Sequence, residues 1–363
     1  MSKNLESNLS AKIIIAGVGG AGNNAINRMQ DDNIQGVKLV GFNTDKQALE
    51  LCRVEKAVQI GAIATKGLGA GAKPEMGEKA AEESIDEIKE IIKDADMVFV
   101  TCGMGGGTGT GAAPIIAKAA KDMGILTVGV VTKPFRFEAK TRMKNAESGI
   151  EKLQEYVDTL IIVPNDKLLE IVDKKTTMPE ALKKADEVLN QCVQGITNLI
   201  NVPSLINLDF ADVQTVMKDK GIAHVGIGHG KGENKAIDAA QMAISSPLLE
   251  TSVEGATDVI VNISGDLSLF DANEAVSYIQ ELTGDDTNII FGSTYDDSKS
   301  DELFVTVIAT GIKDKKNAAK EAIEALKSIP QQKIEIVEHK KHTSVSESSV
   351  GEIKIPTFLQ KKR

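Results

Sequence analysis

Short apolar runs alternate with stretches of helical periodicity through the first half of the chain. Five runs rich in β-branched residues are predicted as strands, at residues 12–16, 37–42, 97–101, 125–132 and 159–163. Unbroken apolar runs separated by helical stretches are typical of a parallel sheet that is buried on both faces. The pattern therefore predicts an α/β, doubly wound domain, which we place at residues 12–175.

A long amphipathic segment follows. Apolar residues recur at helical spacing from Leu182 to Ile200, Pro179 suits a first helical turn, and Pro203 closes the far end. Because the apolar face is wide, we expect this helix, at residues 176–203, to be buried between two domains.

The remaining chain predicts a second, smaller domain and a tail. Strands are predicted at 222–227, 257–263, 288–291 and 303–309, and helices at 235–244, 272–282 and 317–327. These elements indicate an α+β domain at 204–327. Residues 328–351 are charged and Ser-rich and are predicted to be a disordered, flexible linker. Apolar residues return in the terminal peptide, 352–363.

Composition and charge narrow the functional classes. The 363 residues, 42% hydrophobic and 26% charged, exceed a single core and exclude a disulfide mini-protein or a wholly disordered chain. The net charge of −10 argues against a nucleic-acid partner. The polar extension at 1–11 does not resemble a signal peptide, and no apolar run is long enough to span a bilayer. We therefore expect a cytoplasmic protein. Three spaced cysteines and four histidines predict buried thiols and no dedicated metal site.

A first glycine loop follows the first predicted strand. Residues 17–22 contain G-x-G-x-x-G at the start of a helix, where backbone amides can bind phosphate. Asp45 follows the second predicted strand, so the spacing also fits a dinucleotide site in which an acid binds the ribose. At this point a nicotinamide-dependent oxidoreductase remains an alternative.

A second glycine tract points more strongly to a polyphosphate. Residues 103–111 contain six glycines in nine positions, a costly composition unless backbone amides must be left unobstructed. The Thr108 and Thr110 hydroxyls can supplement those amides. A third tract, 67–72, could close over the terminal phosphate or could be an ordinary turn. The oxidoreductase alternative gives residues 103–111 no role.

Three motifs together resemble the FtsZ family, the prokaryotic relatives of tubulin. They are GVGGAGNNAINRM at 17–29, GGGTGTGAAP at 105–114 and NLDFADV at 207–213, and the similarity runs in order over residues 12–311 and resumes in IPTFLQKKR. The resemblance implies a tubulin-like fold, GTP hydrolysis to GDP with Mg²⁺, and assembly into head-to-tail filaments that form the cytokinetic ring. The resemblance leaves open whether a monovalent cation binds as well.

The resemblance also implies a set of nucleotide-binding residues. They are Gly19, Gly20, Ala21, Gly22, Asn23, Asn24, Asn43, Asp45, Ala70, Gly71, Ala72, Gly106, Gly107, Thr108, Gly109, Thr132, Glu138, Arg142, Asn165, Leu182 and Asp186. Among these, Glu138 and Arg142 are expected at i, i+4 on one helix, where they would contact ribose and phosphate or form a surface ion pair.

The base is expected to lie between Asn165 and Asp186. A carboxylate can accept both the N–H and the NH₂ of guanine, a pair that adenine does not offer. Family members commonly carry an aromatic residue where this chain has Leu182, and an Asn where it has Lys73. The resemblance therefore implies that Leu182 covers the base as an aliphatic lid, without aromatic stacking.

The motif at 207–213 has two interpretations. Asp209 and Asp212 have the spacing of a helix-capping pair, and a nucleotide-binding regulator that does not polymerise needs nothing more of them. The resemblance implies instead that Asn207, Asp209 and Asp212 enter the nucleotide pocket of the next subunit and act on the attacking water. Catalysis then takes place at subunit interfaces.

The terminal peptide resembles the FtsZ segment that docks on membrane-tethering and regulatory division proteins. Its apolar positions are Ile355, Pro356, Phe358 and Leu359. The resemblance implies a membrane-associated ring at the division site, reached through such a partner and without direct membrane insertion. A frayed terminus is the alternative.

Overall fold

The computed structural model describes residues 11–170, 172–173, 175–201, 204–206, 208–245, 252–295 and 301–312. All of these belong to one compact unit, residues 1–314. The helix predicted at 317–327, the linker at 328–351 and the peptide at 352–363 lie outside the described residues. So do Pro203 and all but the last residue of the N-terminal extension.

The first half of the chain builds a parallel sheet in the order β3-β2-β1-β4-β5-β6-β7. Its strands are β1 Ile13–Val18, β2 Val37–Asn43, β3 Lys56–Gln59, β4 Met97–Gly103, β5 Leu126–Lys133, β6 Thr159–Pro164 and β7 Gly221–Ile222. The five strands predicted in this region are confirmed. The short edge strand β3 was not predicted, because half of its four residues are exposed and its run carries little apolar signal.

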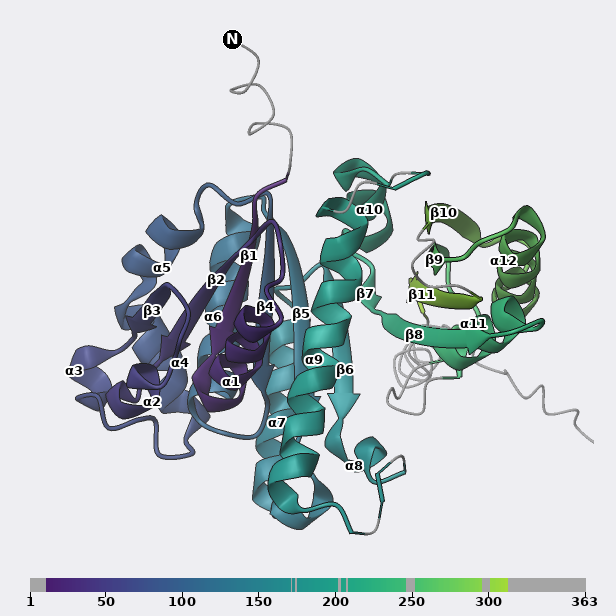
Figure 1. Cartoon of the computed structure of the whole chain (residues 1–363). Helices are drawn as coiled ribbons and strands as arrows, with labels where there is room; N and C mark the ends of the chain where they lie inside the picture. Colours follow the sequence, from purple (N-terminus) through teal and green to yellow (C-terminus); the bar gives the residue numbers. More distant parts are fainter. Residues whose placement is uncertain are drawn as a thin grey trace, which may run out of the picture. The chain divides into compact units, whose positions relative to one another are not determined.

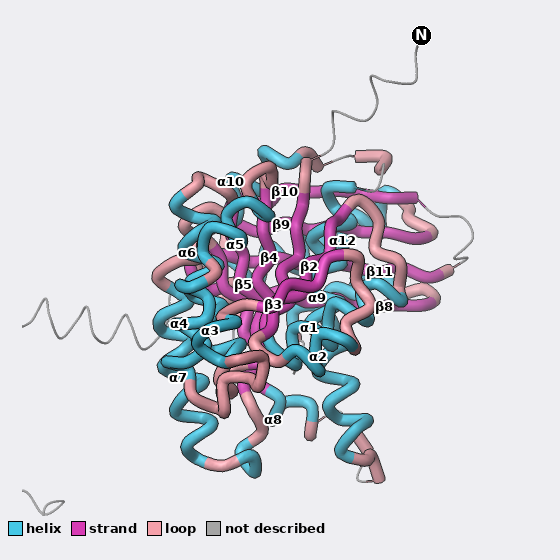
Figure 2. The backbone as a smooth tube through the Cα atoms, turned by 90° about the vertical axis from the view of Figure 1, so that its left-hand side faces the viewer, coloured by secondary structure: helices cyan, strands magenta, loops and turns pink. Residues whose placement is uncertain are grey.

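Helices cover both faces of this sheet (Figure 2). Successive strand residues point to opposite faces, so Ile13 and Ile15 pack toward one set of helices and Ile14 and Ala16 toward the other. The first set is α1 Gly19–Asp31, α9 Met178–Asn201 and α10 Phe210–Met217, and the second is α4 Pro74–Glu83, α5 Ile85–Ile92, α6 Thr108–Asp122 and α7 Lys140–Gln154. Four short helices complete this half: α2 Lys46–Glu50, α3 Ala62–Thr65, α8 Asn165–Leu168 and the 3₁₀ helix η2 Arg136–Glu138.

Helix α9 runs lengthwise beside the strands, from their carboxyl ends to their amino ends (Figure 1). It starts beside α8, which follows the carboxyl end of β6. It ends at Asn201, whose Nδ2 donates to the Gln35 carbonyl at 3.1 Å, just before β2 begins. Its 24 residues span about 36 Å at 1.5 Å per residue. The predicted central helix is therefore present, and it connects the carboxyl-end side of the sheet with the amino-end side.

A second, mixed sheet has the order β10-β9-β11-β8. Its strands are β8 His224–Lys231, β9 Asp258–Gly265, β10 Asn288–Tyr295 and β11 Glu302–Thr310, and its helices are α11 Lys235–Ile244 and α12 Leu269–Thr283. Helix α11 lies directly on β8. A Cβ added to Gly226 would stand 1.7 Å from the Ala243 carbonyl oxygen, so only glycine permits this approach.

The strand predicted at 222–227 is divided between the two sheets. Residues 221–222 form β7, which pairs with β6 in the first sheet, whereas β8 pairs with β11 in the second. Ala223 lies between them and donates its N–H to the Leu160 carbonyl. An apolar run carries no signal for a change of sheet, so periodicity alone could not place this crossing.

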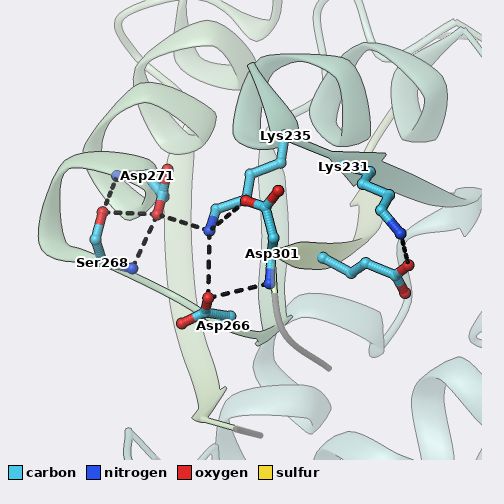
Figure 3. A network of polar contacts seen from close by, with 7 residues as sticks. Lys231, Lys235, Asp266, Ser268, Asp271 and Asp301 are labelled. Atoms are coloured by element: carbon cyan, nitrogen blue, oxygen red, sulfur yellow. Dashed lines mark hydrogen bonds and ion pairs between the residues drawn. The ribbon is translucent and has the colours of Figure 1, made fainter. Parts of the chain in front are cut away.

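One lysine connects three segments of the second sheet (Figure 3). The Lys235 ammonium, on a side chain only 12% exposed, lies 3.8 Å from a carboxylate oxygen of Asp266, Asp271 and Asp301. Asp266 also accepts the Asp301 N–H at 3.1 Å, and Asp271 forms a capping box with Ser268 at the start of α12. This cluster, the Lys235 network, joins α11, α12 and the start of β11.

The three cysteines are free, as the sequence predicts. Cys102 and Cys192 are buried, and burial raises the pKa of each thiol to about 12, while Cys52 is half-buried. Among the helices that the structure describes, none is long and apolar enough to cross a membrane.

Candidate functional site

The first two glycine loops meet at the carboxyl edge of the parallel sheet. One joins β1 to α1 and the other joins β4 to α6, on neighbouring strands. Gly19 has a φ of +71°, and a Cβ added there would stand 2.9 Å from the Gly109 backbone nitrogen. The backbones therefore approach more closely than side chains would allow.

The third glycine tract packs against the second. A Cβ added to Gly107 would lie 2.8 Å from the Ala70 Cβ and 3.2 Å from the Ala72 nitrogen. On its other side the tract is fixed to the end of β2, because Gly69 donates its N–H to the Thr44 carbonyl at 3.2 Å. The structure thus brings together all three loops that the sequence singled out.

Each of the three loops leaves one glycine facing open space. A Cβ added to Gly20, Gly71 or Gly106 would meet no atom within 4 Å beyond its own neighbours along the chain. Beside this space α1 and α6 begin, and neither has a side-chain cap on its first amides. Uncapped amides at two helix N-termini attract anions. The geometry fits a polyphosphate.

Polar side chains beneath the loops hold them in place. The Thr44 and Thr108 hydroxyl oxygens are 2.6 Å apart, which ties the end of β2 to the start of α6. Below them Asn43 donates to Asn23 at 2.8 Å, and Asn23 donates to the Gly17 carbonyl at 2.9 Å. Asn23 and Asn43 are buried, so their side chains support the loops from below.

Other predicted residues surround this centre. Asp45 caps α2 through one carboxylate oxygen, which accepts from Gln47 and Ala48, and it bridges to Leu68 of the third tract. Thr132, on β5, accepts the Met104 N–H at 2.9 Å through its carbonyl oxygen. The remaining loop positions, Ala21, Gly22 and Asn24, lie in the first turns of α1.

The expectation that Glu138 and Arg142 share one helix is wrong. Glu138 ends the 3₁₀ helix η2, Arg142 lies in the first turn of α7, and Ala139 between them has a φ of +95°. A helix cannot continue through Ala139 at this φ, and the Glu138 carboxylate accepts the Phe135 N–H at 2.9 Å in a capping box of η2. The two side chains nevertheless form an ion pair, with the Arg142 Nε 3.1 Å from a Glu138 oxygen.

The residues expected at the base lie on α8 and α9, which pack together. Asn165 is buried, and its Oδ1 has no hydrogen-bond partner among the described residues. A buried acceptor without a donor fits a ligand that supplies one. Asp186 is mostly buried, and desolvation raises the pKa of its carboxyl group to about 6 although Arg28 opposes the rise. Leu182, one turn earlier, is 44% exposed.

Arg28 is the residue at this site that sequence reasoning missed. Its Nε lies 3.4 Å from the Asp186 Oδ2. The two residues are 158 positions apart, so no local spacing could have linked them.

Asp209 and Asp212 lie on the opposite side of the sheet, at the amino ends of the strands. They start α10, which follows the end of α9 (Figure 1). The start of α9 lies about 36 Å from that end, on the side of the sheet that carries the glycine loops. Asp209 accepts the Asp212 N–H at 2.9 Å, and Asp212 accepts the Asp209 N–H at 3.1 Å. Asn207 lies outside the described residues, as do Ile355, Pro356, Phe358 and Leu359. The structure thus confirms the capping geometry and separates the pair from its own subunit's loops.

Within the described part of the chain no group of three His, Cys, Asp or Glu side chains could hold a metal ion. Oxygen ligands suited to Mg²⁺ do occur at the loops, in the Thr44 and Thr108 hydroxyls and the free oxygen of Asp45. An ion there would need further oxygens from the phosphates.

Comparisons with known proteins agree with this geometry. Residues 12–173 match the Tubulin/FtsZ family GTPase domain, and residues 221–313 match the C-terminal domain of the FtsZ family. An empty FtsZ dimer from M. jannaschii is 46% identical, with 84% of this chain and 90% of that chain covered and a TM-score of 0.79. The GDP-bound CetZ1 monomer from Haloferax volcanii, 23% identical over 87% of this chain and 99% of that one, shares the fold with a TM-score of 0.74.

Proposed function

This chain belongs to the FtsZ family and is a tubulin-like GTPase, and from that premise we propose that it assembles head to tail so that one subunit completes the GTP site of the next. The single observation that carries the proposal is the separation of the two halves of the site. The glycine loops lie at the carboxyl ends of the strands of the parallel sheet, and Asp209 and Asp212 lie on the side of their amino ends.

The nucleotide is held by residues of one subunit. The amides at the starts of α1 and α6 bind the phosphates, and the 67–72 tract encloses them. Glu138 and Arg142 contact ribose and phosphate, and Asn165 and Asp186 bind the guanine edge. Mg²⁺ bound with the nucleotide supplies charge neutralisation at the phosphates, held in part by Thr44, Thr108 and Asp45.

The hydrolytic group comes from the neighbouring subunit. Each aspartate uses one carboxylate oxygen for the capping box and keeps the other for water. A carboxylate that orients the attacking water near the γ-phosphate acts through position and charge. Asn207, the third predicted member, belongs to the same sequence motif at 207–213.

An interface of this kind joins unlike surfaces, so each added subunit presents a free surface to the next, and an arrangement that does not close on itself continues as a filament. It produces filaments, and it links hydrolysis to assembly because the site exists only where two subunits meet. The similar M. jannaschii FtsZ is described as a dimer, and CetZ2 from Haloferax volcanii as a GTPγS-bound protofilament. The assembly of these similar proteins supports self-association for this chain.

We extend the proposal to cell division. The filaments form a membrane-associated cytoplasmic ring, tethered through partner proteins that bind Ile355, Pro356, Phe358 and Leu359. Removal of residues 352–363 should spare GTP hydrolysis and abolish ring placement. A normally placed ring in cells that make only the shortened chain would refute the tethering role.

One observation favours a second function. The capping box already gives Asp209 and Asp212 a role within a single subunit, as expected for a nucleotide-binding regulator that does not polymerise. Phosphate release measured against protein concentration, with light scattering in the same cuvette, separates the two. Filament catalysis predicts activity only above a critical concentration, with scattering that decays as GTP is consumed. A constant specific activity without scattering would support the regulator.

A further inference from the structure

An ion pair connects the helix of the first phosphate loop with the helix that carries the base-recognition aspartate. Arg28 lies in the last turn of α1, and its Nε is 3.4 Å from the Oδ2 of Asp186 on α9. The Arg28 side chain is 26% exposed and the Asp186 side chain 14%. Gly19 begins α1 nine residues earlier, about 13 Å away along the helix. The pair therefore lies within one nucleotide's length of the phosphate loops.

Arg28 is the cation that acts on Asp186. Burial raises the pKa of Asp186 to about 6, Arg28 lowers it through charge and a hydrogen bond, and the neighbouring Glu187 raises it slightly. Glu187 is itself paired with Lys184 at 2.9 Å. One turn further along α9, Asn190 donates to Asp32, the residue that caps the end of α1.

The charged side chains of α8, the other helix that borders this site, form ion pairs with residues other than Asp186. Asp166 pairs with Arg136 at 3.1 Å, and Lys167 pairs with Glu170 at 2.9 Å. Neither acts on Asp186. Arg28 is thus the group that counteracts the rise in the pKa of Asp186 that burial causes.

Guanine recognition requires Asp186 to be ionised. A carboxylate accepts from both N1–H and the 2-amino group, whereas a protonated acid presents a donor where the base also presents one. Each carboxylate oxygen has two lone pairs, so Oδ2 can keep Arg28 while it accepts from the base. The ion pair is therefore compatible with bound nucleotide.

We propose that Arg28 is a positioning residue for guanine: it holds the Asp186 carboxylate ionised and directed toward the base, without contacting the reacting phosphates. This inference rests on the proposed role of Asp186 in base recognition. Arg28 acts on nucleotide affinity, so its removal raises KM and leaves kcat at saturating GTP unchanged.

The test measures GDP affinity between pH 5.5 and 8.5 at protein concentrations too low for assembly. GDP carries the same base and is not hydrolysed. Native affinity should fall as the pH drops through about 6, because Asp186 then becomes protonated. In Arg28→Met the midpoint should rise by about one pH unit, so affinity is reduced at pH 7 and recovers at pH 8.5. Arg28→Lys retains the charge and should restore most of the native profile.

Two further variants separate the possible failures. Arg53→Met removes a cation from an exposed ion pair with Asp31 of α1, at 2.7 Å, and should leave the profile unchanged. Asp186→Asn should remove the pH step that belongs to the carboxylate, while titration of the GDP phosphates remains in every variant. If Asp186→Asn removes the step but Arg28→Met leaves the midpoint at the native pH, the role of Arg28 is overturned. If Asp186→Asn binds GDP with the native profile, the proposed base recognition itself fails.

Discussion

Asp209 and Asp212 each accept the other's backbone N–H at the first turn of α10, at distances of 2.9 and 3.1 Å. This reciprocal arrangement fixes both carboxylates at the amino ends of the strands, on the side of the sheet opposite the glycine loops. It also means that a substitution at either position changes helix capping and charge at once. Variants must therefore be chosen to separate the two effects.

Asp212→Asn keeps the cap and removes the charge. The asparagine Oδ1 can still accept the Asp209 N–H, so the free energy of unfolding should be nearly unchanged, whereas Asp212→Ala should lose about 1 kcal/mol. If the carboxylate acts on water, both variants should lose about 100-fold or more in kcat. Chemical denaturation and phosphate release on the same samples would check this. Normal hydrolysis by an assembled Asp212→Asn protein would reduce the pair to a helix cap.

Gly106→Val tests whether the open space at the loops is the phosphate site. The new Cβ meets no atom within 4 Å beyond its own neighbours along the chain, so the fold should be retained, but the side chain enters the space assigned to phosphate. GTP and GDP affinity should fall by more than about tenfold, which corresponds to 1.4 kcal/mol. Titration with a fluorescent GDP analogue, together with thermal unfolding, measures both properties.

Gly107→Val is the matched comparison. Its Cβ would lie 2.8 Å from Ala70 and 3.0 Å from the Lys73 nitrogen, so this variant should be destabilised. Native nucleotide affinity in Gly106→Val would show that the phosphates bind elsewhere.

Much of the fold followed from hydrophobic periodicity because buried strands and a wide-faced helix leave strong signals. The five strands of the first sheet and the central helix are examples. The glycine tracts were equally informative: Gly107 permits the contact with Ala70 that joins two loops, and no other residue type could fill that position.

Features that depend on distant partners were not predictable. The Arg28–Asp186 pair joins residues 158 positions apart, and nothing near Arg28 distinguishes it from a surface arginine at a helix end. The break between Glu138 and Arg142 is instead local: Ala139 adopts a φ of +95°, and i, i+4 spacing carries no signal of such a break. The change of sheet after residue 222 likewise depends on which strand edge is free.

Lys235→Met should destabilise the protein by about 1–3 kcal/mol. It leaves Asp266, Asp271 and Asp301 facing one another without their shared cation (Figure 3). Lys231→Met is the control, because Lys231 pairs with Glu302 at an exposed position and should leave unfolding unchanged. Urea denaturation of both variants gives the comparison. Equal stability of the two would show that the Lys235 network does not contribute to the fold.

The central claim is that one GTP site is made by two subunits, and a mixing experiment tests it most directly. Asp212→Asn retains a nucleotide site and lacks the catalytic carboxylate, whereas Gly106→Val retains the carboxylate and has a weakened nucleotide site. At a GTP concentration too low to fill the weakened site, each protein alone should hydrolyse GTP at or near background. In a mixture, Gly106→Val can supply its Asp212 to GTP held by Asp212→Asn, so phosphate release should clearly exceed the sum of the separate rates. A mixture no faster than that sum, although both proteins sediment together in shared polymers, would contradict the account.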